Sequence, residues 1–330
     1  MPMTQAFALV ELALTPLDWA RREAFRRAAR VRWIRQIWRR KDTRIPLLAC
    51  ASVIVSFAFT LTLPDLLLVA GPILLGVPHL ASDFRYLVLR RRLPKAWLAL
   101  ISLGSALLFI WRILEIEWAR ALRYAELEAV FGFSWALVGL WLGAVPSRRW
   151  WRAALATLPL AAAACVAVRY ATSARLVLAY GHNVMALIIW FFLFRGNQAR
   201  AALPLALVAA GAFGVARQGV PGHVQLFLQA VHYSVWLAWI PQEELGGNAT
   251  LTFGMSARAA RRDFGAIGMA LIAVATLAMI AASTLGAHRA REAYLFLAGF
   301  HAYLEIACLA FFFGRAELSA RDAPPQELSR

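Results

Sequence analysis

The sequence predicts an all-α protein, a polytopic transmembrane helical bundle of about ten spans. The chain of 330 residues is 61% hydrophobic and only 16% charged, and its apolar runs recur from residue 45 almost to the end. Segments such as LALISLGSALLFIW and LPLAAAACVAV lack the polar face that a soluble helical domain needs at a 3.6-residue period. The basic residues lie mainly at the ends of the apolar runs, as in membrane proteins.

Residues 1–44 are predicted to form a basic amphipathic segment on the membrane surface. Thr15, Pro16 and Asp18 resemble a helix start, with a capping residue, a proline and an acid in the first turn. Apolar residues then recur every four positions at Phe25, Ala29, Trp33 and Ile37, among 11 Lys and Arg residues between positions 21 and 44. This pattern indicates an interfacial helix that binds anionic lipid headgroups. An RNA-binding arm is the alternative, but the apolar spacing is too regular for a disordered basic tail, so we expect no nucleic-acid partner despite the net charge of +17.

Residues 45–314 form the predicted transmembrane domain, and residues 315–330 a polar tail. The basic loops, which include RRRLPK, SRR, RGNQAR and SARAARR, favour an orientation with both termini in the cytoplasm, as in an integral protein of a bacterial inner membrane. No cleavable signal peptide is expected, because an arginine-rich segment follows the N-terminal apolar patch. The ten expected spans are 45–63, 65–86, 96–114, 126–145, 151–168, 176–194, 201–216, 224–240, 264–284 and 293–313.

Polar residues that are unusual at membrane depth occur in the even-numbered spans. The second span has His79 and Asp83, and the tenth has His301 and Glu305, each acid one helical turn after its histidine. The sixth and eighth spans contribute the remaining polar residues, which are His182, Asn183, Gln229, His232 and Tyr233. Ionisable groups inside a membrane are costly and usually mark a functional site. These four spans run in the same direction, so they can form an inner bundle.

The four histidines are predicted to bind a metal. Imidazoles with one or two carboxylates suit iron, zinc, copper or manganese better than calcium or magnesium. Redox chemistry makes non-haem iron the first choice, with haem b or another transition metal as alternatives. The structural alternative is that each histidine hydrogen-bonds a neighbouring helix. His223 and His288 lie in predicted loops and are not expected to be ligands.

The carboxylates have two expected roles. Glu305 lies near mid-membrane, where an unpaired carboxylate is costly, so we predict that it is a metal ligand. Asp83 is nearer the cytoplasmic end and could pair with Arg85 or Arg90, so we place it with Asn183, Gln229 and Tyr233 in the layer that orients the ligands. Pro72 and Pro78 should bend the second span just before His79.

The motif Gly76-Val77-Pro78-His79-Leu80-Ala81-Ser82-Asp83 resembles the G-x-P-H-G-x-x-D signature of the bacterial Brp/Blh-like β-carotene dioxygenases. Those are polytopic membrane proteins of similar size that hold non-haem iron with histidines and cleave carotene to retinal. The resemblance implies that His79 is an iron ligand. Leu80 replaces the family's glycine, and the family's later pair of closely spaced histidines is missing, so single histidines would have to complete the ligand shell.

These observations favour a membrane-embedded non-haem metal oxidoreductase or oxygenase acting on a lipid-soluble substrate such as a carotenoid. Aromatic residues would line its apolar slot, namely Trp190, Phe191, Phe192, Tyr233, Trp236, Trp239 and Tyr303. Two alternatives remain open. One is a bis-histidine haem protein that transfers electrons, and the other is a proton-coupled transporter with a His/Asp/Glu relay. The isolated Cys50, Cys165 and Cys308 indicate neither a disulfide framework nor a thiolate zinc site.

Overall fold

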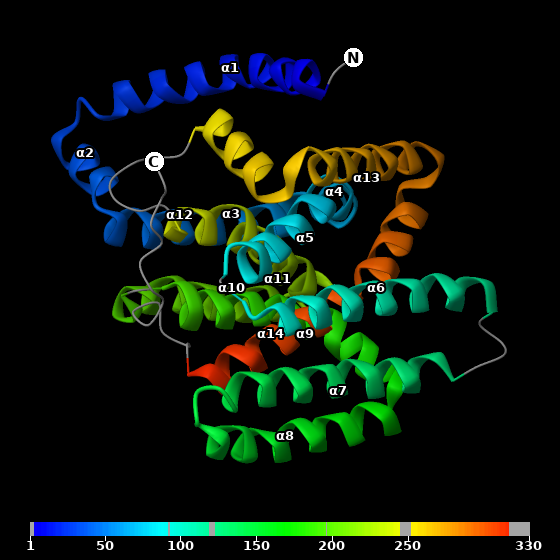
Figure 1. Ribbon diagram of the computed structural model, residues 1–330. Helices are drawn as coiled ribbons and strands as arrows, with labels where there is room; N and C mark the ends of the chain where they lie inside the picture. The colour runs from blue at the N-terminus through cyan, green and yellow to red at the C-terminus, as the bar shows by residue number, and fades with distance from the viewer. Residues whose placement is uncertain (1–2, 92, 119–122, 196, 245–251, 317–330) are drawn as a thin grey trace.

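The computed structural model describes residues 3–91, 93–118, 123–195, 197–244 and 252–316, and over these ranges the chain is helical without a strand. The predicted polar tail lies almost entirely outside them. Figure 1 shows α9, α11 and α14 in the middle of the molecule, with α1 and α8 along opposite edges. The helices are α1 (Met3–Ala28), α2 (Arg32–Arg39), α3 (Lys41–Thr62), α4 (Pro64–Ala70), α5 (Gly76–Phe84), α6 (Lys95–Trp118), α7 (Tyr124–Ala144), α8 (Trp150–Arg169), α9 (Ala171–Ile189), α10 (Ala202–Ala216), α11 (His223–Ser234), α12 (Ile240–Glu244), α13 (Phe253–Ala298) and α14 (Phe300–Arg315).

Eight helical segments of the described chain are long and apolar enough to cross a membrane. The all-α membrane class is therefore supported, while the number of ten spans stays a prediction. Two of the ten expected spans, 264–284 and 293–313, fall within the single segment Phe253–Arg315, which is interrupted by non-helical backbone at Gly265 and at Gly286, between the two spans. The expected span 224–240 is not among the eight. It carries Gln225, Gln229 and His232, which lower its hydropathy.

The surface of the bundle carries many large apolar side chains that no other part of the chain covers. On α13 the exposed fractions are 72% for Ile267, 65% for Leu271 and 63% for Leu277, and on α8 Leu158 is 76% exposed. Large apolar side chains exposed in this number are unusual on a soluble monomer. These faces are suited to contact with lipid.

The N-terminal segment differs from its prediction in two respects. The helix does not start at Thr15, because α1 already begins at Met3 and continues through Pro16. It also breaks after Ala28, and the turn that follows brings the rings of Phe25 and Trp38 within 5.6 Å of each other. The expected single amphipathic helix is therefore two helices, and their position on the membrane surface stays a prediction.

Asp18 attaches α1 to the start of α13. Its carboxylate accepts hydrogen bonds from the backbone N–H groups of Phe253 and Gly254, at 2.7 and 3.0 Å. Burial raises the pKa of Asp18, but these two bonds and the neighbouring Arg22 outweigh it and hold the pKa below its ordinary value. The carboxylate therefore serves as a cap for the orphan donors of α13.

The helix that carries His79 is continuous but wider than an α-helix on both sides of the site. A π-helical turn, Gly71–Leu75, lies between α4 and α5, and a second one, Arg85–Leu89, follows α5. Proline has no N–H to donate to the preceding turn, which explains why the distortion occurs around Pro72 and Pro78. A widened turn thus precedes His79, while the predicted bend at this point stays a prediction. Such π-turns are frequent at functional sites.

Helix α14, which carries His301 and Glu305, packs closely against α7. A Cβ atom at Gly143 of α7 would overlap the backbone carbonyl oxygen of Phe311, and one at Gly314 of α14 would overlap that of Leu140. Only glycine therefore allows the two backbones to approach to this distance, as in other membrane helix pairs with small residues. This contact fixes the position of α14 in the centre of the bundle.

Candidate metal centre

Four helices bring the predicted histidines to one place. His79 of α5 lies with its ring centroid 5.1 Å from that of His232 of α11 and 5.3 Å from that of His301 of α14. His182 of α9 lies 4.9 and 4.7 Å from the rings of His232 and His301. The exposed fractions of His79, His232 and His301 are 1%, 0% and 4%. The inner cluster predicted from the sequence is thus present. His223 and His288 do not belong to it.

The ligand atoms of three of these residues are close enough to share one ion. One ring nitrogen from each of His79, His232 and His301 lies within 4.8 Å of the others. Three nitrogens at this separation have a common centre at most about 2.8 Å from each of them, whereas a metal–imidazole bond is about 2.1 Å long. A shift of each nitrogen by about 0.7 Å toward this centre would therefore bring the three imidazoles into a coordination sphere.

Hydrogen bonds to backbone carbonyls three or four residues earlier in the chain orient three of the four imidazoles. The Nδ1 atom of His182 donates to the carbonyl of Leu178 at 3.0 Å, and that of His79 to the carbonyl of Leu75 at 3.2 Å. His301 makes the equivalent bond to Ala298. With the proton on Nδ1, the Nε2 lone pair is available, and an imidazole oriented in this way is typical of a metal ligand.

The unpartnered nitrogens argue against the structural alternative. Within the described chain, Nε2 of His79, His232 and His301 has no hydrogen-bond partner, and neither has Nδ1 of His232. Buried polar atoms are rarely left without a partner, because the loss of hydration is costly. Because one ring nitrogen of each of these three residues lies within 4.8 Å of the others, a single metal ion could supply the missing partner.

The bounds of α9 differ from those expected for the sixth span. Helix α9 begins at Ala171, five residues before the expected start at 176, so His182 lies more than one turn deeper in its helix than the sequence suggested. His182 is also the member of the cluster that lies outside the group of three closest ligand atoms. Its role as a fourth ligand stays a prediction.

The two carboxylates lie together in the core beside Cys308 of α14. Asp83 and Glu305 are both fully buried. Glu305 accepts a hydrogen bond of 3.0 Å from the indole N–H of Trp236 through Oε1, while its Oε2 and both oxygens of Asp83 have no partner in the described chain. Glu305 is not in the group of three closest ligand atoms. Its assignment as a ligand stays a prediction.

The expected pairing of Asp83 with Arg85 or Arg90 is wrong. Both guanidinium groups lie on Asp263 of α13 instead, with N–O distances of 2.5 Å for Arg85 and 3.6 Å for Arg90. Asp83 shares the inward face of its helix with His79, four residues before it, whereas Arg85 points toward α13. Among the described residues Asp83 is therefore a buried acid without an ion-pair partner, a more unusual group than the sequence indicated.

Of the residues expected to orient the ligands, Gln229 and Tyr233 form a pair. The Gln229 amide donates to the Tyr233 hydroxyl at 2.9 Å, and the Tyr233 ring lies 4.7 Å from that of His79. Tyr294 of α13 also reaches His79, with 3.5 Å between its hydroxyl and Nδ1. A Cβ atom at Gly76 would lie 2.5 Å from Cζ of Tyr294. The glycine of the motif therefore makes room for this tyrosine.

Only some of the aromatic residues expected to line the apolar slot border a cavity. Trp190, Trp236 and Trp239 are fully buried, and the Trp190 and Trp239 rings pack 5.0 Å apart. These tryptophans fill the core, as aromatic residues in apolar helices usually do. Tyr233 and Tyr303, by contrast, line a cavity.

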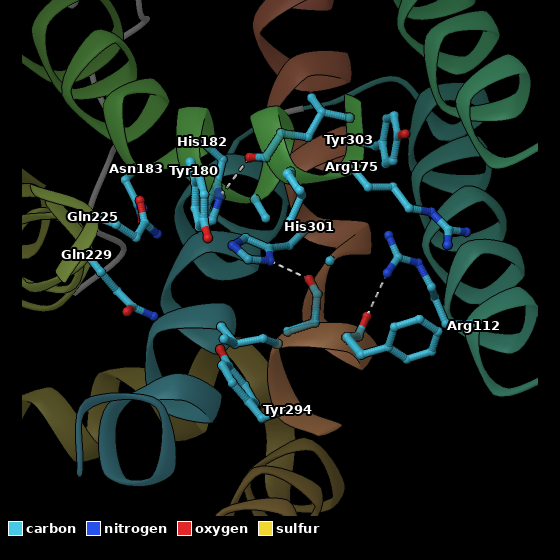
Figure 2. Close-up of a pocket in the computed structure, with 18 of the residues that line it drawn as sticks. Arg112, Arg175, Tyr180, His182, Asn183, Gln225, Gln229, Tyr294, His301 and Tyr303 are labelled. Carbon is cyan, nitrogen blue, oxygen red and sulfur yellow. Dashed lines mark hydrogen bonds between the residues drawn. The ribbon is translucent and has the colours of Figure 1, made fainter. Parts of the chain in front are cut away.

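This cavity of about 310 Å³ reaches His79, His182 and His301 from the end of the bundle where α6 ends and α7, α9 and α11 begin. His232 does not line it and lies behind the other three rings. In Figure 2, Tyr294 and the two labelled glutamines approach the histidines from different sides of the cavity. The cavity gives a small molecule access to the cluster.

An ion-pair network on one wall of the cavity was not expected from the sequence. Arg112 of α6 contacts Glu128 of α7 at 2.5 Å, and Arg175 of α9 contacts Glu128 at 2.7 Å and Glu115 at 2.6 Å. Figure 2 shows Arg112 and Arg175 on the same side of His301. The sequence feature that could have indicated this network is the presence of Arg112 and Glu128 inside apolar spans, where charged residues are rare unless paired.

Comparison with known proteins adds no assignment. No protein-family model, no curated protein and no solved structure matches this chain.

Proposed function

We propose that the histidine cluster holds one transition-metal ion and that the protein is a membrane-embedded oxidoreductase, with non-haem iron as its first candidate metal. The observation that supports this most directly is the set of unpartnered Nε2 atoms on His79, His232 and His301, with ligand atoms within 4.8 Å of one another. Neutral imidazoles suit iron, copper or zinc. The resemblance of residues 76–83 to the Brp/Blh-like motif also favours iron.

The residues of the site have distinct roles under this proposal. His79, His232 and His301 hold the ion, and His182 supplies a fourth nitrogen. The Nδ1–H bonds to backbone carbonyls keep the rings oriented. The bound ion would supply redox or Lewis-acid chemistry at a position left open toward the cavity. Asp83 and Glu305 each follow a ligand by one helical turn, a spacing at which their carboxyl groups can orient that ligand or retain a proton.

The crowding of the rings disfavours a haem between two of the histidines. Each of the four imidazoles has at least one neighbouring imidazole with its ring centroid at 4.7–5.3 Å. A porphyrin bound axially by two histidines needs a flat slot between them that is free of other side chains. The other two histidines would occupy that slot.

Metal analysis and a visible spectrum of the purified protein test the proposal. We expect stoichiometric iron without a Soret band. Each of H79A, H232A and H301A should lower the bound metal, whereas the control variants H223A and H288A should not. H182A distinguishes a four-histidine shell from a three-histidine shell. A Soret band would instead identify a haem protein, and full metal content in H79A, H232A and H301A would refute the assignment.

A further inference from the structure

The wall of the cavity opposite the ion-pair network is polar and contains an amide without a partner. Asn183 lines the cavity with an exposed fraction of 1%, and within the described chain neither its amide nitrogen nor its amide oxygen has a hydrogen-bond partner. Figure 2 shows Asn183, Gln225 and Gln229 on one side of His301, with Arg112 and Arg175 on the other. A buried amide of this kind is costly unless a ligand satisfies it. The substrate is therefore not expected to be a pure hydrocarbon.

The charges around the cavity leave one cation unbalanced. Arg112 and Arg175 are balanced by Glu115 and Glu128. The third arginine of the lining, Arg291 of α13, has no carboxylate within ion-pair distance in the described chain, and its Nε is buried without a hydrogen-bond partner. An unpaired guanidinium beside a cavity is well suited to a planar anion, because it can donate two parallel hydrogen bonds to a carboxylate.

The position of Arg291 relative to the histidines sets the geometry of such a ligand. Arg291, Tyr294 and Ala298 are spaced three and four residues apart, so they share one face of α13, and all three line the cavity. Along α13, Arg291 precedes Ala298 by seven residues, which corresponds to about 10 Å of helix rise, and the Ala298 carbonyl accepts the hydrogen bond from His301. A head group at Arg291 would therefore leave room for several carbon atoms of a chain before the histidines.

We propose that the cavity binds an amphiphile with a carboxylate head, a long-chain acid in the simplest case. Arg291 binds the carboxylate, the Asn183 amide hydrogen-bonds a polar group of the ligand, and the chain extends toward His79 and His301. This inference deepens the proposed function, on which it rests for the chemistry at the metal. It narrows the class of lipid-soluble substrate to an acid. It disfavours a carotene, which has no polar head group.

Equilibrium binding of radiolabelled dodecanoate to the full-length protein in nanodiscs of zwitterionic lipid tests this assignment, with dodecan-1-ol as the uncharged probe. We expect dodecanoate to bind at least about tenfold more tightly than the alcohol, in line with a charge-assisted pair. R291Q should remove this preference, and R291K should restore part of it. R289Q is the matched control, since Arg289 is an exposed arginine two residues away on the same helix. N183L should weaken binding of both probes.

Parallel metal analysis separates this inference from the proposed function. If R291Q and R289Q bind dodecanoate equally well, or the alcohol binds as tightly as the acid, the inference is overturned. If removal of the metal abolishes dodecanoate binding and R291Q has no effect, the carboxylate binds the ion rather than Arg291, and the inference is also overturned. Arg291-dependent binding to a protein that holds no metal would support the inference while refuting the proposed function. Melting temperatures of the variants confirm that each is folded.

Discussion

A methyl group added at Gly143 should disturb the metal centre from a distance, through the position of α14. In G143A the new Cβ would overlap the Phe311 carbonyl oxygen and lie 3.1 Å from its carbonyl carbon. Carbon atoms pack at about 3.5–4.0 Å, so α7 and α14 must separate by about 0.5 Å or more. A metal site tolerates only about 0.2 Å in its ligand distances. His301 and Glu305 move with α14, so we expect metal affinity to fall by about 10-fold or more, as for loss of an orienting partner.

The effect on stability has a predicted sign and a matched control. Overpacking costs about 1–3 kcal/mol, and the better helix propensity of alanine offsets about 0.5–1 kcal/mol of it. A Cβ at Gly181, beside His182, meets no atom within 4 Å, so G181A should be neutral or stabilise the protein. Thermal unfolding in detergent and metal titration of both variants provide the measurement. Equal melting temperatures and equal metal affinity in G143A and G181A would refute the reasoning.

Two further predictions concern buried charges. The Glu243 side chain is 2% exposed and pairs at 2.7 Å with Arg195, whose side chain is fully buried. E243Q should therefore destabilise the protein by about 3–5 kcal/mol. The control variant E23Q breaks exposed pairs of α1 and should cost at most about 1 kcal/mol. Unfolding by denaturant compares the two, and similar losses would contradict the argument. D83N and E305Q should weaken metal affinity by about 10- to 100-fold if these acids orient ligands. A larger loss in a metal titration of E305Q alone would make Glu305 a ligand, and unchanged affinity in both would exclude either role.

Much of the site could be predicted because its signal is local. A histidine or acid in an apolar run is recognisable without knowing its neighbours, and the i, i+4 spacing places Asp83 under His79 and Glu305 under His301. The helix starts were less predictable. Continuation of α1 through Pro16 and the early start of α9 depend on contacts with other helices rather than on capping residues.

The partners of the charged residues could not be predicted, because they come from distant parts of the chain. Arg85 pairs with Asp263 across 178 positions, and proximity in sequence wrongly favoured Asp83. The balance of charge around the cavity likewise depends on residues that are distant in the sequence. Arg291 stands out only once Arg112 and Arg175 are seen to be paired, which requires the packing of α6, α7 and α9.

The sequence by itself indicated an all-α membrane protein with four histidines and two acids inside apolar spans, since hydropathy and helical spacing are properties of consecutive residues. Only the tertiary structure decided which nitrogens face one another, which acids lack a cation and where a ligand can enter. Those properties depend on the rotation and depth of each helix, which are set by close contacts such as those at Gly76 and Gly143. Packing, rather than periodicity, converts the inward-facing histidines into a site.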